Sequence, residues 1–81
     1  YNILCNHSGG VVDDVFVYRL GPSEALVCVN AANRAKDFAW FVNNNPFPGE
    51  AVFTDEGDDW AQVALQGPAA ERVLQRLTAL D

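Results

Sequence analysis

Two adjacent carboxylates, Asp13 and Asp14, lie inside an otherwise apolar stretch at positions 11–20. Asp is rare in β-strands, and an ionised carboxylate that leaves water without a partner is costly. Some partner or pKa shift must therefore compensate Asp13 or Asp14. Solvated and ion-paired acids are more common than catalytic ones, so the pair by itself leaves both a structural and a catalytic role open.

The other residues capable of chemistry lack the neighbours that their chemistry requires. His7 has no Cys, Asp or second His at metal-ligand spacing, so we expect a surface histidine and no metal site. Cys5 and Cys28 lie in apolar, strand-like runs without a nearby base, which predicts unreactive free thiols. Ser8 and the two glycines after it lead into a strand rather than a helix, so this turn is neither a nucleophile elbow nor a phosphate loop.

The elements around the two acids follow from the residue pattern. The turn-forming residues at 6–10 predict the first turn of a hairpin. The β-branched and aromatic residues at 11–20 predict a strand, and strand alternation places Asp13 and Asp14 on opposite faces. After a break at 21–24, residues 25–30 predict a second strand that runs antiparallel to the first.

The second half of the chain predicts two helices and two further strands. A helix at 33–44 would be capped by the side-chain oxygen of Asn33 and would bury one face made of Ala35, Phe38, Phe41 and Val42. Strands are expected at 51–54 and 60–65, with a solvated acidic turn at 55–59 between them. A second helix would start near Pro68 and carry an apolar stripe of Ala70, Val73, Leu74, Leu77 and Leu80.

This order of elements predicts the α+β class. The expected architecture is an antiparallel sheet with two helices, an incomplete ferredoxin-like split βαβ unit preceded by a β-hairpin. Residues 1–81 would form a single partial domain, because the chain starts at Tyr1, contains no Met and is too short to bury a large core.

Charge and hydropathy exclude several classes of partner. Five basic residues against eleven acidic ones give a net charge of −6, which argues against nucleic acid. No segment approaches the roughly 20 apolar residues that span a bilayer, so we expect no membrane partner. Two unpaired cysteines fit a reducing compartment, and we expect the protein in the cytoplasm, or in the mitochondrion of a eukaryote.

Five sequence blocks, in order and at family-like spacing, resemble the aminomethyltransferase family, the T-protein of the glycine cleavage system. They are LCN at 4–6, GGVVDD at 9–14, VCVNAAN at 27–33, KDFAW at 36–40 and ALQGP at 64–68. The resemblance implies an internal fragment of the folate-binding region. The parent enzyme would take a one-carbon unit from the aminomethyl-lipoyl arm of H-protein, pass it to tetrahydrofolate and release ammonia.

The resemblance also implies roles for three residues. Asp13 matches the catalytic carboxylate of the family, Tyr1 matches a position that lines the folate site, and Asn30 is a further polar contact in the same pocket. The implied partners are lipoylated H-protein and tetrahydrofolate, which acts as co-substrate, and no metal is implied. We expect the fragment alone to be inactive.

Two other functions stay open at this point. The folate-binding domain of a dimethylglycine or sarcosine oxidising enzyme would look similar. A non-catalytic folate-binding paralogue would keep the fold and dispense with the catalytic acid.

Overall fold

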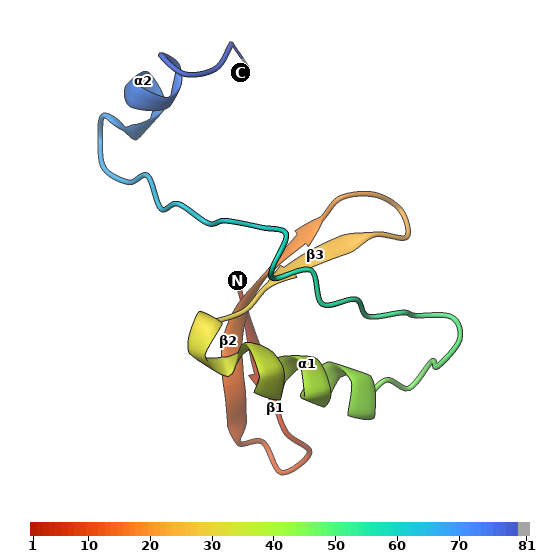
Figure 1. Cartoon of the computed structure of the whole chain (residues 1–81). Coiled ribbons are helices and arrows are strands. Elements are labelled where there is room, and N and C mark those ends of the chain that lie inside the picture. Colours follow the sequence, from red (N-terminus) through yellow and green to blue (C-terminus); the bar gives the residue numbers. More distant parts are fainter. Residues whose placement is uncertain (80–81) are drawn as a thin grey trace.

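A hairpin at the start of the chain provides the framework of the fold. The computed structural model describes residues 1–79, and its first two strands are β1 (Asn2–Cys5) and β2 (Val11–Arg19). They pair antiparallel, with Ile3 opposite Asp14, and the register shifts between Leu4 and Cys5. β3 (Ala25–Cys28) adds to the other edge of β2, which gives an antiparallel sheet of order β1-β2-β3 (Figure 1).

The hairpin turn confirms the sequence expectation for residues 6–10. Asn6 Oδ1 accepts hydrogen bonds from the backbone N–H of Ser8 at 3.0 Å and of Gly10 at 2.8 Å. Gly9 has a φ of 84°, a conformation that L-residues with a side chain rarely adopt. The turn is therefore built from the Asn6 side chain and the conformational freedom of Gly9.

Helix α1 (Arg34–Asn43) follows a short 3₁₀ turn, η1 (Ala31–Asn33), and lies across the β1–β2 part of the sheet (Figure 1). The Lys36 ammonium donates to the Val12 carbonyl of β2 and ties the helix to the sheet. Among the described residues the buried side chains are Val15, at 3% exposure, and two acids, Asp13 at 7% and Asp37 at 0%. The best-buried part of this small structure thus contains two carboxyl groups.

Two details of the predicted helix were wrong. Asn33 occupies the N-cap position as expected, but its side chain makes no capping hydrogen bond. Ala35 and Val42, placed on the buried face by the apolar pattern, are exposed, whereas Asp37 is fully covered. The buried residue of α1 is therefore Asp37, and the helix presents no continuous buried apolar stripe.

The α+β class is confirmed, since residues 1–79 form a three-stranded antiparallel sheet and two α-helices. The strands predicted at 51–54 and 60–65 were wrong, since these segments are extended but unpaired except for a single bridge between Pro48 and Ala51. Val52 and Val63 are 82% and 87% exposed. A strand needs a neighbour for its backbone groups, and no neighbour pairs with these segments within residues 1–79.

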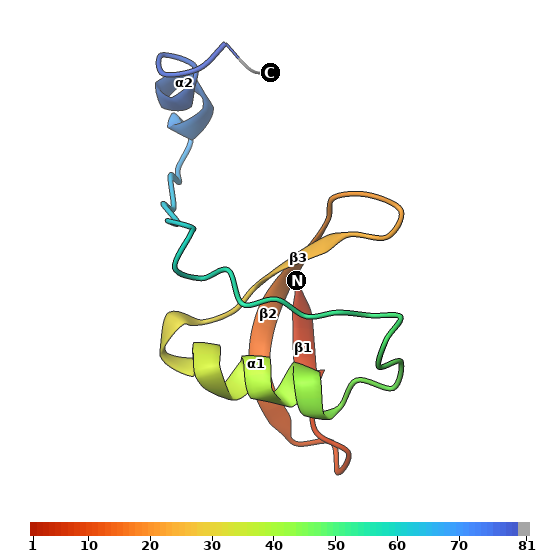
Figure 2. The same ribbon diagram turned by 45° about the vertical axis from the view of Figure 1, so that its right-hand side comes forward.

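Helix α2 (Ala70–Leu74) is short and lies away from the sheet in both ribbon views (Figures 1 and 2). Val73, Leu74 and Leu77 of its predicted stripe are exposed, and Leu80 lies outside the described residues. Most of a helix's stability in a protein comes from packing an apolar face, so an unpacked stripe supports only a short helix.

Candidate functional site

The exposed face of β2, the central strand of the sheet, gathers three polar side chains from three parts of the chain. The Tyr1 hydroxyl donates to Asp14 Oδ2 at 3.0 Å, and the Asn30 amide donates to Asp14 Oδ1 at 3.2 Å. The Asp14 side chain is exposed and lies on the face of β2 opposite to that of Asp13, as strand alternation predicted. A phenol, a carboxylate and an amide therefore meet at one accessible place.

The register of the sheet explains why these three residues meet. Phe16 pairs with Cys28 between β2 and β3, and continuing this antiparallel register places Asn30 opposite Asp14. Asn2 pairs with Val15 between β1 and β2, so the same continuation places Tyr1 opposite Phe16. The rings of Tyr1 and Phe16 meet edge to face, with 5.3 Å between their centroids, which holds the phenol over the strand.

Asn30 also connects the exposed face of β2 to its buried face. Its Nδ2 donates to Asp13 Oδ1 at 2.9 Å and to the backbone carbonyl of Asp14 at 3.2 Å, in addition to Asp14 Oδ1. Ionised carboxylates accept hydrogen bonds and cannot donate them, so the amide must present its N–H groups to the two acids. The two aspartates point apart, and one amide holds both.

Asp13 and Asp37 form a coupled pair between β2 and α1. A hydrogen bond from Asp37 holds the pKa of Asp13 well below its usual range, and the amides of Asn30 and Asn33 act in the same direction. Burial raises the pKa of Asp37, and the hydrogen bond and charge of Asp13 raise it further, while Lys36, 3.7 Å from Asp37 Oδ1, opposes the shift. Of the two acids, Asp13 is therefore the one that ionises first, and Asp37 is the one on which a proton is favoured.

The predicted site residues are only partly brought together. Tyr1 and Asn30 converge, but the acid that both contact is Asp14, whereas Asp13 touches Asn30 from beneath the sheet and does not touch Tyr1. The catalytic role of Asp13 stays a prediction. Sequence reasoning missed Asp37, although an acid one position before Phe38, inside a helix face that must pack, was a signal that could have drawn attention to it.

Tyr1 is affected electrostatically by the acid that it contacts. Its hydrogen bond to Asp14 raises the pKa of the Tyr1 phenol above its ordinary value, with smaller contributions from burial and from the charges of Asp14 and Asp13. A phenol with a raised pKa remains protonated and keeps donating at any physiological pH. The Tyr1 to Asp14 contact is therefore a fixed donor and acceptor pair.

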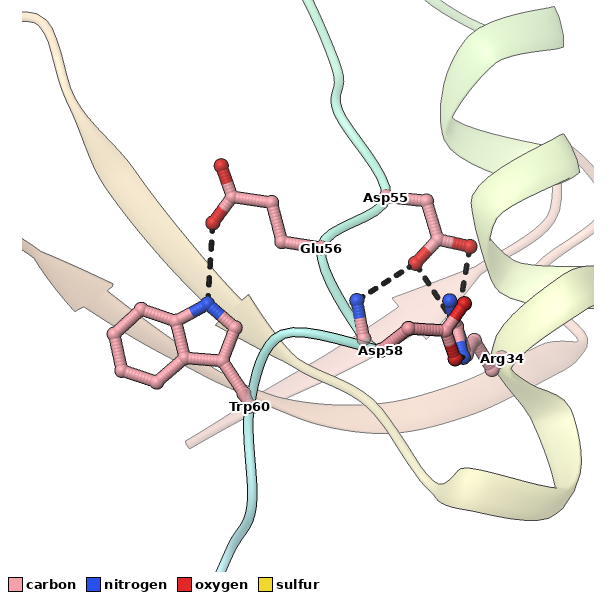
Figure 3. Close-up of polar contacts among 6 residues, drawn as sticks. Arg34, Asp55, Glu56, Asp58 and Trp60 are labelled. Atoms are coloured by element: carbon pink, nitrogen blue, oxygen red, sulfur yellow. Dashed lines mark hydrogen bonds and ion pairs between the residues drawn. The ribbon is translucent and has the colours of Figure 1, made fainter.

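A second polar cluster anchors the acidic turn (Figure 3). Arg34 Nε donates to both carboxylate oxygens of Asp55, at 2.9 and 3.1 Å, and Arg34 Nη1 donates to Asp58 Oδ1 at 2.7 Å. These contacts lower the pKa of both acids and raise that of Arg34. The turn is exposed, as expected, but it is bound to the first residue of α1 rather than simply solvated.

The remaining candidate residues have structural partners. His7 Nε2 lies 3.0 Å from Asn44 Oδ1 and joins the hairpin turn to the end of α1. Both cysteines are free, as predicted; Cys5 is exposed, and Cys28 donates to Gln62 Oε1 at 3.1 Å.

Within residues 1–79, no group of three or more His, Cys, Asp or Glu side chains could hold a metal ion. No helix of this part of the chain is long and apolar enough to cross a membrane.

Comparison with known proteins gives a consistent match. The model of the GCVT N-terminal domain matches residues 1–81. The chain is 49% identical over its full length to an aminomethyltransferase of Geobacillus kaustophilus, and 47% identical to those of Listeria monocytogenes serotype 4a and Herpetosiphon aurantiacus. It spans 22% of the length of each of these relatives. No solved structure matches the chain.

Proposed function

Because this chain belongs to the family of the GCVT N-terminal domain, whose named relatives are aminomethyltransferases, we propose that it forms part of a tetrahydrofolate-dependent aminomethyltransferase of glycine cleavage. The donor would be the aminomethyl-lipoyl arm of H-protein, and the acceptor would be tetrahydrofolate. The enzyme would work in the cytoplasm, or in the mitochondrion of a eukaryote. The relatives do not favour the flavin-linked alternative.

The proposed reaction needs no oxidant. The transferred carbon loses its bonds to the lipoyl sulfur and to the amino nitrogen, and it forms bonds to N5 and N10 of tetrahydrofolate. The two protons that these nitrogens lose go to the sulfur and to the departing ammonia. What the protein must supply is orientation of an amine nucleophile and a negative charge near the iminium carbon.

The observation that supports this function is the convergence of Tyr1 and Asn30 on Asp14. The exposed carboxylate can accept a hydrogen bond from an N–H of tetrahydrofolate and can stabilise a cation beside it. Tyr1 and Asn30 fix both of its oxygens, so that it is oriented before the substrate arrives. The exposed rings of Tyr1 and Phe16 offer an apolar surface beside it for the folate ring system.

Two acids compete for the direct role in this proposal. The family resemblance assigns it to Asp13, which is 7% exposed and faces Asp37, whereas the geometry favours Asp14, which is exposed and held by Tyr1 and Asn30. We therefore place Asp14 in contact with tetrahydrofolate and Asp13 behind it. Both assignments predict a fall in turnover on substitution, and they differ in which residue has the larger effect.

Paired variants of the full-length protein test the proposal. The assay is tetrahydrofolate-dependent release of ammonia from aminomethyl-lipoyl H-protein. Asp14→Asn should lower kcat by about a hundredfold or more with folding preserved, the usual size for loss of a group that acts at the reacting atoms. A larger loss with Asp13→Asn would return the direct role to Asp13. Full activity of both variants would refute the function.

The 81-residue chain itself gives a further expectation. It spans 22% of its relatives, so we expect it to bind tetrahydrofolate weakly or not at all when isolated. Isothermal titration calorimetry checks this directly. Clear saturable binding would show that the site formed by residues 1–30 is sufficient.

A further inference from the structure

We propose that Asp37 is a positioning residue. Its protonated carboxyl donates a hydrogen bond to Asp13, and the Asp13 carboxylate oriented in this way holds the Asn30 amide in place against Asp14. The proposal rests on the proposed function, since Asp14 there faces the substrate. It adds a residue from α1, on the far side of β2, to the machinery of the site.

The burial of the pair requires a proton between the two acids. Asp37 is 0% exposed, and Asp13 Oδ2 and both oxygens of Asp37 are buried without a hydrogen-bond partner. Two ionised carboxylates in contact repel each other, and their buried oxygens would have no donor. A single proton on Asp37, donated to Asp13, supplies the missing hydrogen bond.

The surrounding charged groups do not remove the need for this proton. Lys36, on the same helix, lies 3.7 Å from Asp37 Oδ1, but its side chain is 51% exposed and its ammonium already donates to the Val12 carbonyl. From β2, Asp14 adds a further negative charge on the other face, and Tyr1 is a neutral donor to it. Burial of Asp37, together with the hydrogen bond and charge of Asp13, outweighs the opposing charge of Lys36 and favours a proton on Asp37.

Once Asp37 carries a proton and donates it in a hydrogen bond to Asp13, hydrogen bonds connect Asp37 to the exposed face of β2. Asp13 Oδ1 accepts from the Asn30 amide at 2.9 Å, and the same amide donates to Asp14 Oδ1 at 3.2 Å. Hydrogen bonds to ionised acceptors are about twice as strong as neutral ones. An ionised, correctly oriented Asp13 is thus a strong anchor for Asn30, and Asp37 provides both the charge state and the orientation.

Two variants of the full-length protein separate a positioning role from simple packing. Asp37→Asn keeps an N–H donor that does not titrate, and Asp37→Leu fills a similar volume without a donor. We expect Asp37→Leu to lower kcat about tenfold, the loss expected from one charge-assisted hydrogen bond, while Asp37→Asn stays within about threefold of the wild type. Asp58→Asn, at a 90% exposed side chain, is the matched control and should leave kcat unchanged.

The dependence of kcat on pH separates the proposed role of Asp37 from a loss of packing, because a change in packing alone would not alter it. Wild-type kcat should fall at high pH as Asp37 ionises, and Asp37→Asn should abolish this fall. Equal kcat per folded molecule in all three proteins, with only thermal stability changed, would overturn the proposal.

Carboxyl ¹³C NMR tests the proton independently of catalysis. At pH 5, about one unit above the ordinary pKa of Asp, we expect the Asp37 carboxyl to remain protonated and that of Asp13 to be ionised. Two ionised carboxyls at pH 5 would refute the role of Asp37 and leave the proposed function standing. Full activity of both Asp13→Asn and Asp14→Asn, with a protonated Asp37 in the wild type, would refute the proposed function instead.

Discussion

Asp37 of α1 is fully buried and interacts with the buried Asp13 of β2 across the contact between the helix and the sheet, which raises the pKa of Asp37 and lowers that of Asp13. A helix usually packs on a sheet through apolar side chains, and here a pair of acids occupies the best-buried part of that contact. Such a pair is stable only in one protonation state. The contact between helix and sheet is therefore sensitive to pH, and this sensitivity has a definite sign.

The first prediction concerns stability against pH. In the unfolded chain both acids titrate near pH 3.9, whereas the folded pair keeps one proton over a wide range. Above about pH 4 the unfolded chain releases protons that the folded pair retains, so the pair's contribution to stability falls as pH rises through the raised pKa of Asp37. Below about pH 4 the unfolded chain binds more protons than the pair, so the contribution falls again as pH drops through the lowered pKa of Asp13.

Thermal unfolding of the wild type and of Asp37→Asn, followed by circular dichroism across pH 3–9, measures this effect. The difference between the two proteins should change with a slope of at most about 1.4 kcal/mol per pH unit, the limit for one proton. The variant should lose the fall on the alkaline side and keep the fall on the acid side. Parallel stability curves would contradict the shared proton.

Local sequence signals predicted the first half of the fold well. The Asn6 to Gly9 turn, the alternation along β2 and the proline that follows Asn45 each determine local backbone geometry. The hairpin, β3 and α1 formed within one or two residues of their expected bounds, and Asn33, expected to begin the helix, is the last residue of η1. The segments at 51–54 and 60–65 also carry strand-like patterns. They stayed unpaired because pairing depends on a neighbouring strand, which local pattern does not provide.

The site was predictable only in part, for a related reason. Tyr1 and Asn30 were both identified, but which aspartate they meet depends on the register across three strands. Asp37 was missed because apolar periodicity counts an acid as a surface residue. Its burial is understandable only once Asp13 is known to face it, and that is a contact between residues 24 positions apart.

The second prediction concerns Asn30, whose amide is shared by two carboxylates. Asn30→Ala removes the donor to the buried Asp13 oxygen and should destabilise the fold by about 1–3 kcal/mol, the cost of leaving a buried acceptor unsatisfied. Asn30→Asp should cost more, because a third carboxylate would replace the donor. Chemical denaturation measures both. Asn43→Ala, at an exposed position on α1, is the control, and equal effects at Asn30 and Asn43 would show that the bridge contributes nothing.

The third prediction concerns the Arg34 cluster (Figure 3). Asp55 receives Arg34 Nε on both oxygens and is 33% exposed in its side chain, whereas Asp58 is 90% exposed, so Asp55→Asn should loosen the turn more than Asp58→Asn. The readout is amide hydrogen exchange at Gly57, whose N–H donates to Asp55. We expect an increase of up to about fivefold for Asp55→Asn at low salt, the range of exposed ion pairs.

Protection of the Gly57 amide in the Arg34 cluster should depend on pH in a defined direction. Arg34 lowers the pKa of both acids, so the protection of Gly57 should be complete above about pH 4 and lost as pH falls through the lowered values. Arg34→Met should shift this loss of protection to higher pH, because Gly57 still donates to Asp55 but the pKa of Asp55 is no longer lowered by Arg34. Unchanged exchange in Arg34→Met would show that the turn is held by other contacts.

The fourth prediction uses three glycines with different constraints. Gly9→Ala should cost about 1 kcal/mol, because φ is 84° although a Cβ there would meet no atom within 4 Å. At Gly10 a Cβ would lie 2.8 Å from Asn6 Nδ2, so Gly10→Ala should disturb the Asn6 turn through contact. Gly21 has neither constraint, and Gly21→Ala should be neutral or slightly stabilising. Thermal unfolding that ranked Gly21→Ala with the other two would contradict this account of the hairpin turn.

The last prediction tests the contact between Tyr1 and Asp14 without any substrate. The acid raises the pKa of the Tyr1 phenol through its hydrogen bond, so an ultraviolet titration of phenolate should show Tyr1 ionising above the ordinary value of about 10. Asp14→Asn removes the negative acceptor and should move the Tyr1 pKa back toward 10. Asp13→Asn should have a much smaller effect, because Asp13 acts on Tyr1 through charge alone. Tyr1→Phe, compared with Tyr18→Phe, assigns the two phenols, and an equal response of Tyr1 to both aspartate variants would show that Asp14 is not its partner.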